Sequence, residues 1–103
     1  MSELKGFQKK YLRGLAHNLN PLVLIGQKGV NQSVIKSVDE ALDAHELIKV
    51  KFNEFKEKEQ KKELISVIEK GSRCELAGLI GHIAIFYKEN KDPKKRKIKI
   101  PAK

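Results

Sequence analysis

Apolar residues recur at the spacing of an α-helix, about 100° per residue, in three segments of the chain. The first segment covers residues 3–17, where lysines and an arginine fill the arc opposite to the apolar one. We expect this helix to end near His17, because Pro21 disfavours helical geometry at the residue before it. Its predicted buried face consists of Leu4, Phe7, Tyr11, Leu12 and Leu15.

The second and third helical segments cover residues 32–45 and 58–70. Asn31 is a favourable N-cap for the second, since its short side chain can accept a hydrogen bond from the first turn. Gly71 is expected to end the third helix in a left-handed cap. The predicted buried faces are Val34, Ile35, Val38, Ala41, Leu42 and His45 in the second helix, and Leu64, Ile65, Val67 and Ile68 in the third.

Four shorter segments are typical of β-strands. Residues 22–25 form a continuous apolar run, which indicates a buried strand. Residues 47–52 alternate between apolar and charged side chains, which indicates a strand with one packed face. Residues 73–80 and 83–87 are expected to form a hairpin around a tight turn at Gly81-His82.

The order of these segments predicts the fold class. In the alternating strand, Ile48, Val50 and Phe52 point to one face, whereas Lys49 and Lys51 point to the other. One face of the sheet should therefore be packed and the other open to solvent. The order α-β-α-β-α-β-β then predicts an α/β fold, a two-layer sandwich with a four-stranded mixed sheet. We assign residues 1–90 to this single domain and residues 91–103 to a basic C-terminal tail.

The positive charge is gathered at the two ends of the chain. The 103 residues carry 22 Lys and Arg against 13 Asp and Glu, a formal net charge of +9. Residues 1–30 contribute +4 and residues 88–103 contribute +6, whereas residues 31–87 contribute −1. A charge that only kept the protein soluble could be spread anywhere, so this clustering favours a polyanionic partner.

The composition also predicts where the protein works. No apolar run approaches the roughly 18 residues that a membrane span needs, and Lys5, Lys9 and Lys10 interrupt any N-terminal signal sequence. The single cysteine, Cys74, allows no disulfide within the chain, which fits a reducing compartment. We therefore expect a cytoplasmic protein that has no membrane segment.

The strongest local motif is Gly26-Gln27-Lys28-Gly29, which joins the first predicted strand to the second predicted helix. Glycines let a backbone approach a ligand closely, and a helix N-terminus favours phosphate through its unpaired amides and its dipole. The spacing matches neither a Walker loop nor the dinucleotide-binding fingerprint. An ordinary turn with two permissive residues is the structural alternative.

Basic side chains outside this loop are further candidates for contacts with a polyanion. Acidic residues rarely interleave with them, although a solvated surface or a solubilising tail would look similar, and the tail also resembles a nuclear-localisation tetrapeptide. The candidates are Lys9, Lys10 and Arg13 on the first helix, Lys49 and Lys51 on the open face of the sheet, and Lys94, Lys95, Arg96 and Lys97 in the tail.

The sequence offers little support for a catalytic site or a metal site. The three histidines, His17, His45 and His82, lack metal-ligand spacing, and Cys74 fits a small buried residue better than a nucleophile. Asp39, Glu40 and Asp43 are more consistent with a solvated helix face than with a divalent-cation site. We expect no enzymatic activity, no cofactor, no metal and no small-molecule substrate.

Several stretches together resemble one known family, the CRM domain (chloroplast RNA splicing and ribosome maturation), in its stand-alone prokaryotic YhbY-type form. The resemblance covers nearly the whole chain in the same order. It rests on the segment Leu12-Arg13-Gly14-Leu15-Ala16-His17, the run 22–25 with Gly26-Gln27-Lys28-Gly29-Val30, the segment 45–51, and the closing segment 80–88.

The resemblance implies a fold similar to the C-terminal domain of translation initiation factor three, and RNA binding through a KH-like GxxG loop. It also implies association with precursors of the large ribosomal subunit. The sequence therefore predicts an RNA-binding protein of ribosome assembly, in which amides of residues 26–30 and the helix N-terminus hold a phosphate. The alternative is an adaptor that docks on acidic or ribosomal-protein partners.

Overall fold

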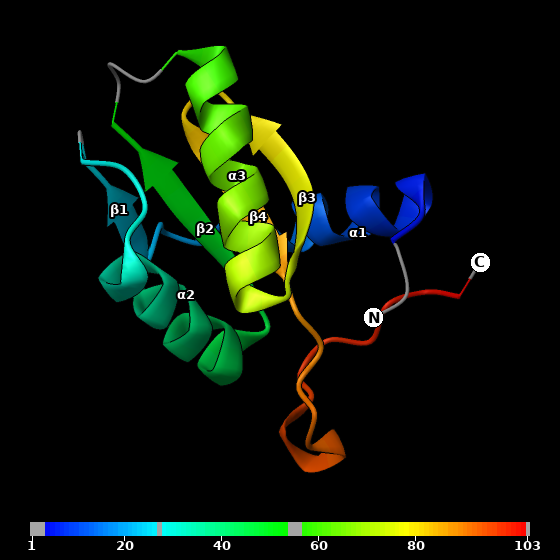
Figure 1. Cartoon of the computed structure of the whole chain (residues 1–103). Helices are drawn as coiled ribbons and strands as arrows, with labels where there is room; N and C mark the ends of the chain where they lie inside the picture. Colours follow the sequence, from blue (N-terminus) through cyan, green and yellow to red (C-terminus); the bar gives the residue numbers. More distant parts are fainter. Residues whose placement is uncertain (1–3, 27, 54–56, 103) are drawn as a thin grey trace.

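The computed structural model describes residues 4–26, 28–53 and 57–102, and its centre is a four-stranded sheet in the order β1-β2-β4-β3 (Figure 1). β1 runs parallel to β2, whereas β4 is antiparallel to both of its neighbours. The strands are β1 (Val23–Ile25), β2 (Leu47–Phe52), β3 (Glu75–Ile80) and β4 (Ile83–Tyr87). The predicted α/β class, element order, mixed sheet and hairpin are confirmed, and Gly81 has the positive φ of 59° that its turn requires.

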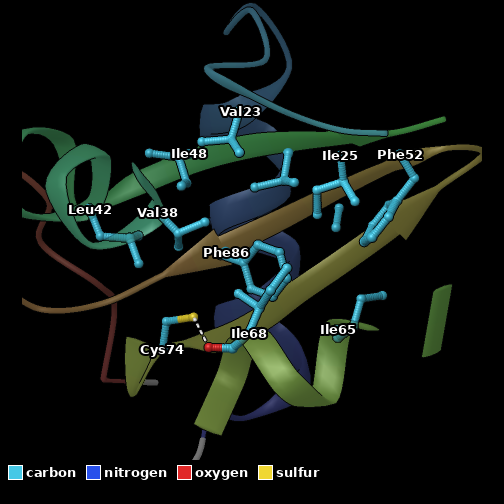
Figure 2. Close-up of a cluster of buried hydrophobic side chains, with 12 residues drawn as sticks. Val23, Ile25, Val38, Leu42, Ile48, Phe52, Ile65, Ile68, Cys74 and Phe86 are labelled. Carbon is cyan, nitrogen blue, oxygen red and sulfur yellow. Dashed lines mark hydrogen bonds between the residues drawn. The ribbon is translucent and has the colours of Figure 1, made fainter. Parts of the chain in front are cut away.

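Two helices cover one face of the sheet, which we call the near face (Figure 1). They are α2 (Gln32–His45) and α3 (Lys58–Ser72), and each buries an apolar stripe. Val38 and Leu42 of α2 pack with Ile65 and Ile68 of α3 around Phe86 at the centre of the sheet (Figure 2). Burial of these side chains is the main source of stability in this layer.

The opposite face, the far face, is only half open. α1 (Gly6–Ala16) packs across it and buries Leu12 and Ala16 against Leu47, Ile85 and Tyr87. The prediction of a wholly solvent-exposed second face was therefore wrong. The alternation in β2 reported only on that strand, whereas β4 is apolar on both faces and can pack on both.

The buried stripe of α1 is narrower than its apolar arc suggested. Phe7, Tyr11 and Leu15 are each about two-fifths exposed, because the helix meets the sheet through Leu12 and Ala16. Val67 of α3 is likewise exposed, contrary to the prediction for this residue. The helical period correctly placed these residues on one side, but packing selects only part of a wide arc.

The residue predicted to cap the start of α2 does so, whereas α3 ends at a different residue from the one predicted. Asn31 caps α2 as predicted, and its Oδ1 accepts a hydrogen bond from the amide of Val34 at 3.0 Å. Gly71 does not end α3; Arg73 adopts the left-handed conformation at φ 53° instead. A Cβ at Gly71 would lie 2.8 Å from Cδ1 of Ile35, so this glycine lets α2 and α3 approach closely.

The segment after β4 folds back onto the domain. It contains a short 3-10 helix, Pro93–Lys95, and then runs toward α1, where Ile98 and Ile100 join the far-face core. Its anchor is Glu46, which is fully buried and has a φ of 62°. The Glu46 carboxylate accepts hydrogen bonds from the backbone amides of Asn90, Lys97 and Ile98.

Across the described residues, none of the helices combines the length and the apolar character needed to cross a lipid bilayer.

Candidate nucleic-acid interface

The glycine loop lies where β1 ends and α2 begins, at one end of the sheet (Figure 1). We call this end the loop end. The amide of Gly29 donates to the carbonyl oxygen of Gly26 at 3.1 Å, which closes a tight turn. β2 ends beside it, since the amide of Asn53 donates to the carbonyl of Ile25 at 2.8 Å. Lys28 is exposed, whereas Gln27 lies outside the described residues.

The fold requires glycine at only one of the two glycine positions in this loop. Gly29 has φ 77°, a conformation that strains any L-residue with a side chain. Gly26 has no positive φ, and a Cβ built on it would meet no heavy atom within 4 Å. The fold therefore has no steric need for glycine at residue 26, and the space beside its Cα is open to a ligand.

Part of the predicted amide cluster is already used by the protein. The amide of Gly29 is bound to Gly26, and the amide of Val34 is bound to the side chain of Asn31. Of the amides from residue 26 to the start of the helix, those of Gly29 and Val34 therefore already have partners within the protein. The amides of Gln32 and Ser33, in the first turn of α2, have no partner within the helix and remain suited to an anion.

The far face continues the loop with two lysines. Lys51 is the register partner of Leu24 on β1 and of Ile83 on β4, so these three side chains share the far face. Leu24 lies two residues before Gly26, which makes the open half of the far face continuous with the loop. Lys49 stands one row away, and its Nζ donates to the carbonyl oxygen of His17 at 3.2 Å.

The basic side chains of α1 differ in their exposure and in their contacts within the protein. Arg13 reaches β3, where its Nη1 donates to the carbonyl oxygen of Ala77 at 2.9 Å. A Cβ at Gly78 would lie 2.5 Å from Cδ of Arg13, so a glycine here makes room for the arginine. Lys9 is half-buried and Lys10 is exposed. Arg13 thus has a structural contact in addition to its charge.

The basic tail lies apart from the loop, at the opposite end of the sheet, which we call the tail end (Figure 1). Arg96 is held there by an ion pair with Glu89 at 3.2 Å and by a hydrogen bond from its Nε to the carbonyl of Asn90 at 2.9 Å. Lys94, Lys95 and Lys97 are exposed. The structure therefore brings the loop together with Lys51, and leaves the tail cations as a separate group.

Sequence reasoning missed the apolar part of the far face. Leu24 is 71% exposed and Ile80 is 64% exposed, one at each edge of the sheet at the loop end. The run 22–25 was interpreted as buried, but β1 is an edge strand and buries only Val23 and Ile25. Its shortness, three residues, was the available signal, since edge strands are often short.

Two titratable groups in the core, Cys74 and Tyr87, have raised pKa values. Burial, followed by the nearby Glu69 carboxylate, raises the pKa of the Cys74 thiol to about 12, and the thiol donates to the carbonyl of Ile68 (Figure 2). Burial also raises the pKa of Tyr87 to about 12, with Glu46 as the next cause. Among the residues described, no group of three His, Cys, Asp or Glu side chains could hold a metal ion.

Comparison with known proteins finds relatives whose names describe RNA binding. A relative from Bacillus subtilis (strain 168), named "Probable RNA-binding protein YqeI", is 44% identical over 91 residues, 88% of this chain and 94% of its own length. A Haemophilus influenzae protein named "RNA-binding protein" is 37% identical over 103 residues and the full length of both chains.

A solved structure has the same fold along almost the whole chain. The solution structure of the hypothetical protein SAV1595 from Staphylococcus aureus matches with a TM-score of 0.79 at 39% identity, and covers 96% of this chain and 100% of that one. The family model described as the CRS1 / YhbY (CRM) domain matches residues 4–88, which include the glycine loop and all four strands. The chain therefore belongs to the CRS1/YhbY (CRM) domain family.

Proposed function

We propose that this protein binds RNA without catalysing a reaction, and that it acts on ribosomal RNA in precursors of the large ribosomal subunit in the cytoplasm. The observation that carries the proposal is the open space at Gly26, beside the first turn of α2. The names of the relatives support binding to RNA as the general activity. The assignment to ribosome assembly rests on the family resemblance.

The proposed mechanism is recognition of the sugar-phosphate backbone. A phosphate lies against Gly26 and accepts hydrogen bonds from the free amides of the first turn of α2, while Lys28 adds positive charge beside it. The next phosphates pass over Lys51 and Lys49 on the far face. The flank of α1 that carries Lys9, Lys10 and Arg13 continues this path, and Lys94, Lys95, Arg96 and Lys97 add affinity from the tail end.

The aromatic residues favour this mode over reading of bases. Phe52, Phe86 and Tyr87 are buried in the two cores, so the described strands present no exposed ring on which successive bases could stack. The exposed rings among the described residues, Phe7 and Tyr11, lie on α1. Backbone contacts of this kind position a protein on RNA and are insensitive to sequence. Selection of a ribosomal site would then come from the shape of the RNA.

The loop is tested by replacing Gln27 and Lys28 together with aspartate and measuring RNA affinity by fluorescence anisotropy. We expect at least a tenfold loss of affinity, because the change adds two negative charges and removes one positive charge beside the phosphate. The matched control, Ser37→Asp with Lys70→Asp, makes the same charge change at exposed positions on α2 and α3. Equal affinities of the two double variants would remove the loop from the mechanism.

The RNA partner is tested by crosslinking in cells, followed by sequencing of the attached RNA. We expect the reads to concentrate in large-subunit ribosomal RNA and its precursors. Reads spread evenly over messenger and ribosomal RNA would contradict the role in ribosome assembly while leaving general RNA binding intact.

A further inference from the structure

A second recessed surface lies at the tail end, away from the glycine loop. It is a groove of about 560 Å³ between the C-terminal half of α1, the start of β1 and the returning tail. Tyr11 and Leu15 of α1 form one wall, Leu19 and Leu22 continue it, and Ile98 of the tail lies opposite. Because Leu22 precedes β1 and Gly26 follows it, the groove and the loop lie at opposite ends of the same strand.

Hydrogen bonds within the fold hold the groove in shape. Its tail wall is held by Glu46, whose buried carboxylate binds the amides of Lys97 and Ile98. Farther along, the side-chain amide of Gln8 donates to the carbonyl oxygen of Pro101 at 3.1 Å and ties the tail to α1. The two walls are therefore fixed on both sides before any ligand arrives, which lowers the entropic cost of binding.

The apolar surface of this groove is unusually exposed for such a small protein. Four large apolar side chains, Tyr11, Leu15, Leu19 and Leu22, are each between 41% and 54% exposed. All four line this one groove, and Tyr11 and Leu15 are one helical turn apart on α1, so they are grouped and not scattered single residues. Contiguous apolar patches with a polar rim are typical of protein interaction sites.

The charge of the groove identifies the chemistry of its ligand. Its rim carries Lys97 and Lys99, with His45 at the end of α2, and the described lining residues include no Asp or Glu. An apolar wall beside cations complements a peptide that alternates aliphatic and acidic side chains. A second copy of this chain, with a net charge of +9, would instead be repelled.

RNA fits this groove less well than a peptide does. Recognition of splayed bases uses aromatic rings or arginine planes for stacking, and in the described lining of the groove Tyr11 and His45 are the side chains that carry a ring. The remaining apolar lining is aliphatic. Aliphatic side chains pack well against leucine or isoleucine anchors of a peptide.

We propose that this groove docks an acidic, aliphatic-rich peptide segment of a partner protein, at a site independent of the glycine loop. The protein can then hold RNA along the glycine loop and the far face while a protein partner occupies the groove. This inference goes beyond RNA binding and would stand if the loop were shown to bind nothing.

The proposal is tested by selecting displayed random 12-residue peptides on the full-length protein. We expect enriched peptides to be net negative and to carry several Leu, Ile or Val residues. Leu19→Glu, which places a charge on the apolar wall, should weaken a selected peptide at least tenfold, and Lys99→Glu should weaken it severalfold. The control Val67→Glu has a similarly exposed position on α3 and should leave peptide affinity unchanged.

Two further readouts separate the groove from the loop. In amide NMR spectra, a selected peptide should shift the signals of Leu15, Leu19 and Leu22, whereas an oligouridylate 12-mer should shift signals of residues 28–34 and leave those three leucines unchanged. Leu19→Glu should leave affinity for the oligouridylate unchanged. The proposal is overturned if no acidic peptide is enriched, if Leu19→Glu binds the selected peptides normally, or if the oligouridylate or a second copy of the chain occupies the groove.

Discussion

At the scale of single residues, the glycine loop combines two positions that look equivalent in the sequence and differ in the structure. The backbone conformation requires glycine at residue 29, because φ there is 77°. Gly26 has ordinary geometry and open space around it. The sequence predicted the loop and both glycines, but it could not divide their roles, because a φ angle depends on how the chain enters the following helix.

This difference predicts opposite outcomes for two alanine substitutions. Gly29→Ala should cost roughly 1–2 kcal/mol of folding free energy, since alanine is disfavoured at positive φ. Gly26→Ala should leave stability within about 0.5 kcal/mol of the wild type and lower RNA affinity, because the new methyl group occupies the phosphate position. Urea denaturation and fluorescence anisotropy measure the two effects. A Gly26→Ala protein with wild-type affinity would show that no ligand approaches this Cα.

Cys74 leads to a prediction about alkaline pH. Its thiol keeps its proton in the folded protein up to a pKa of about 12, whereas in the unfolded chain it ionises near pH 9. Above that pH the unfolded chain binds fewer protons than the folded one, so stability should fall as the pH rises from about 9 toward 12. Denaturant unfolding at pH 7.5 and pH 10 should show this loss, and a smaller one in Cys74→Ala. Identical losses would mean that Cys74 is not the cause.

At the scale of elements, hydrophobic periodicity predicted where a helix lies in the chain better than it predicted which of its side chains are buried. α2 was predicted at its observed bounds, because Asn31 and a clear helical period mark it. α1 was found, but its apolar arc is wider than the stripe it buries. Packing against the sheet decides which part of the arc is used, and the sequence of a helix does not contain that information.

Two leucines of α1 test this distinction. Leu12→Ala should destabilise the protein by about 2–5 kcal/mol, because Leu12 is fully buried in the far-face core. Leu15→Ala, three residues away on the same predicted arc, should cost less than about 1 kcal/mol, since Leu15 is 43% exposed. The midpoints of urea denaturation give both values. Similar losses of stability in the two variants would show that α1 buries the wider arc that the sequence predicted.

At the scale of the whole molecule, the fold separates the cations of the glycine loop and the far face from those of the tail. The sequence showed charge at both chain ends but could not show that β4 carries the tail to the end of the sheet opposite the loop. The far face joins Lys49 and Lys51 to the loop through register, a property of strand pairing. The tail cations, by contrast, lie beside the groove.

Phosphate contacts predict a strong salt dependence of RNA binding. If about five phosphates of a single strand are neutralised, the slope of log affinity against log salt concentration should be about −3.5. Titrations of a single-stranded RNA from 50 to about 300 mM potassium chloride measure it. A flat response would contradict the proposed phosphate path, whatever the affinity at one salt concentration.

The anchoring of the tail by Glu46 has a practical consequence for anyone who trims this protein. A fragment that stops at residue 88, where the family match ends, would delete all three backbone donors to the Glu46 carboxylate and remove Ile98 and Ile100 from the far-face core. Such a fragment should be hard to obtain in soluble, folded form. We therefore expect the folding unit to extend as far as Pro101, beyond the last residue of the family match.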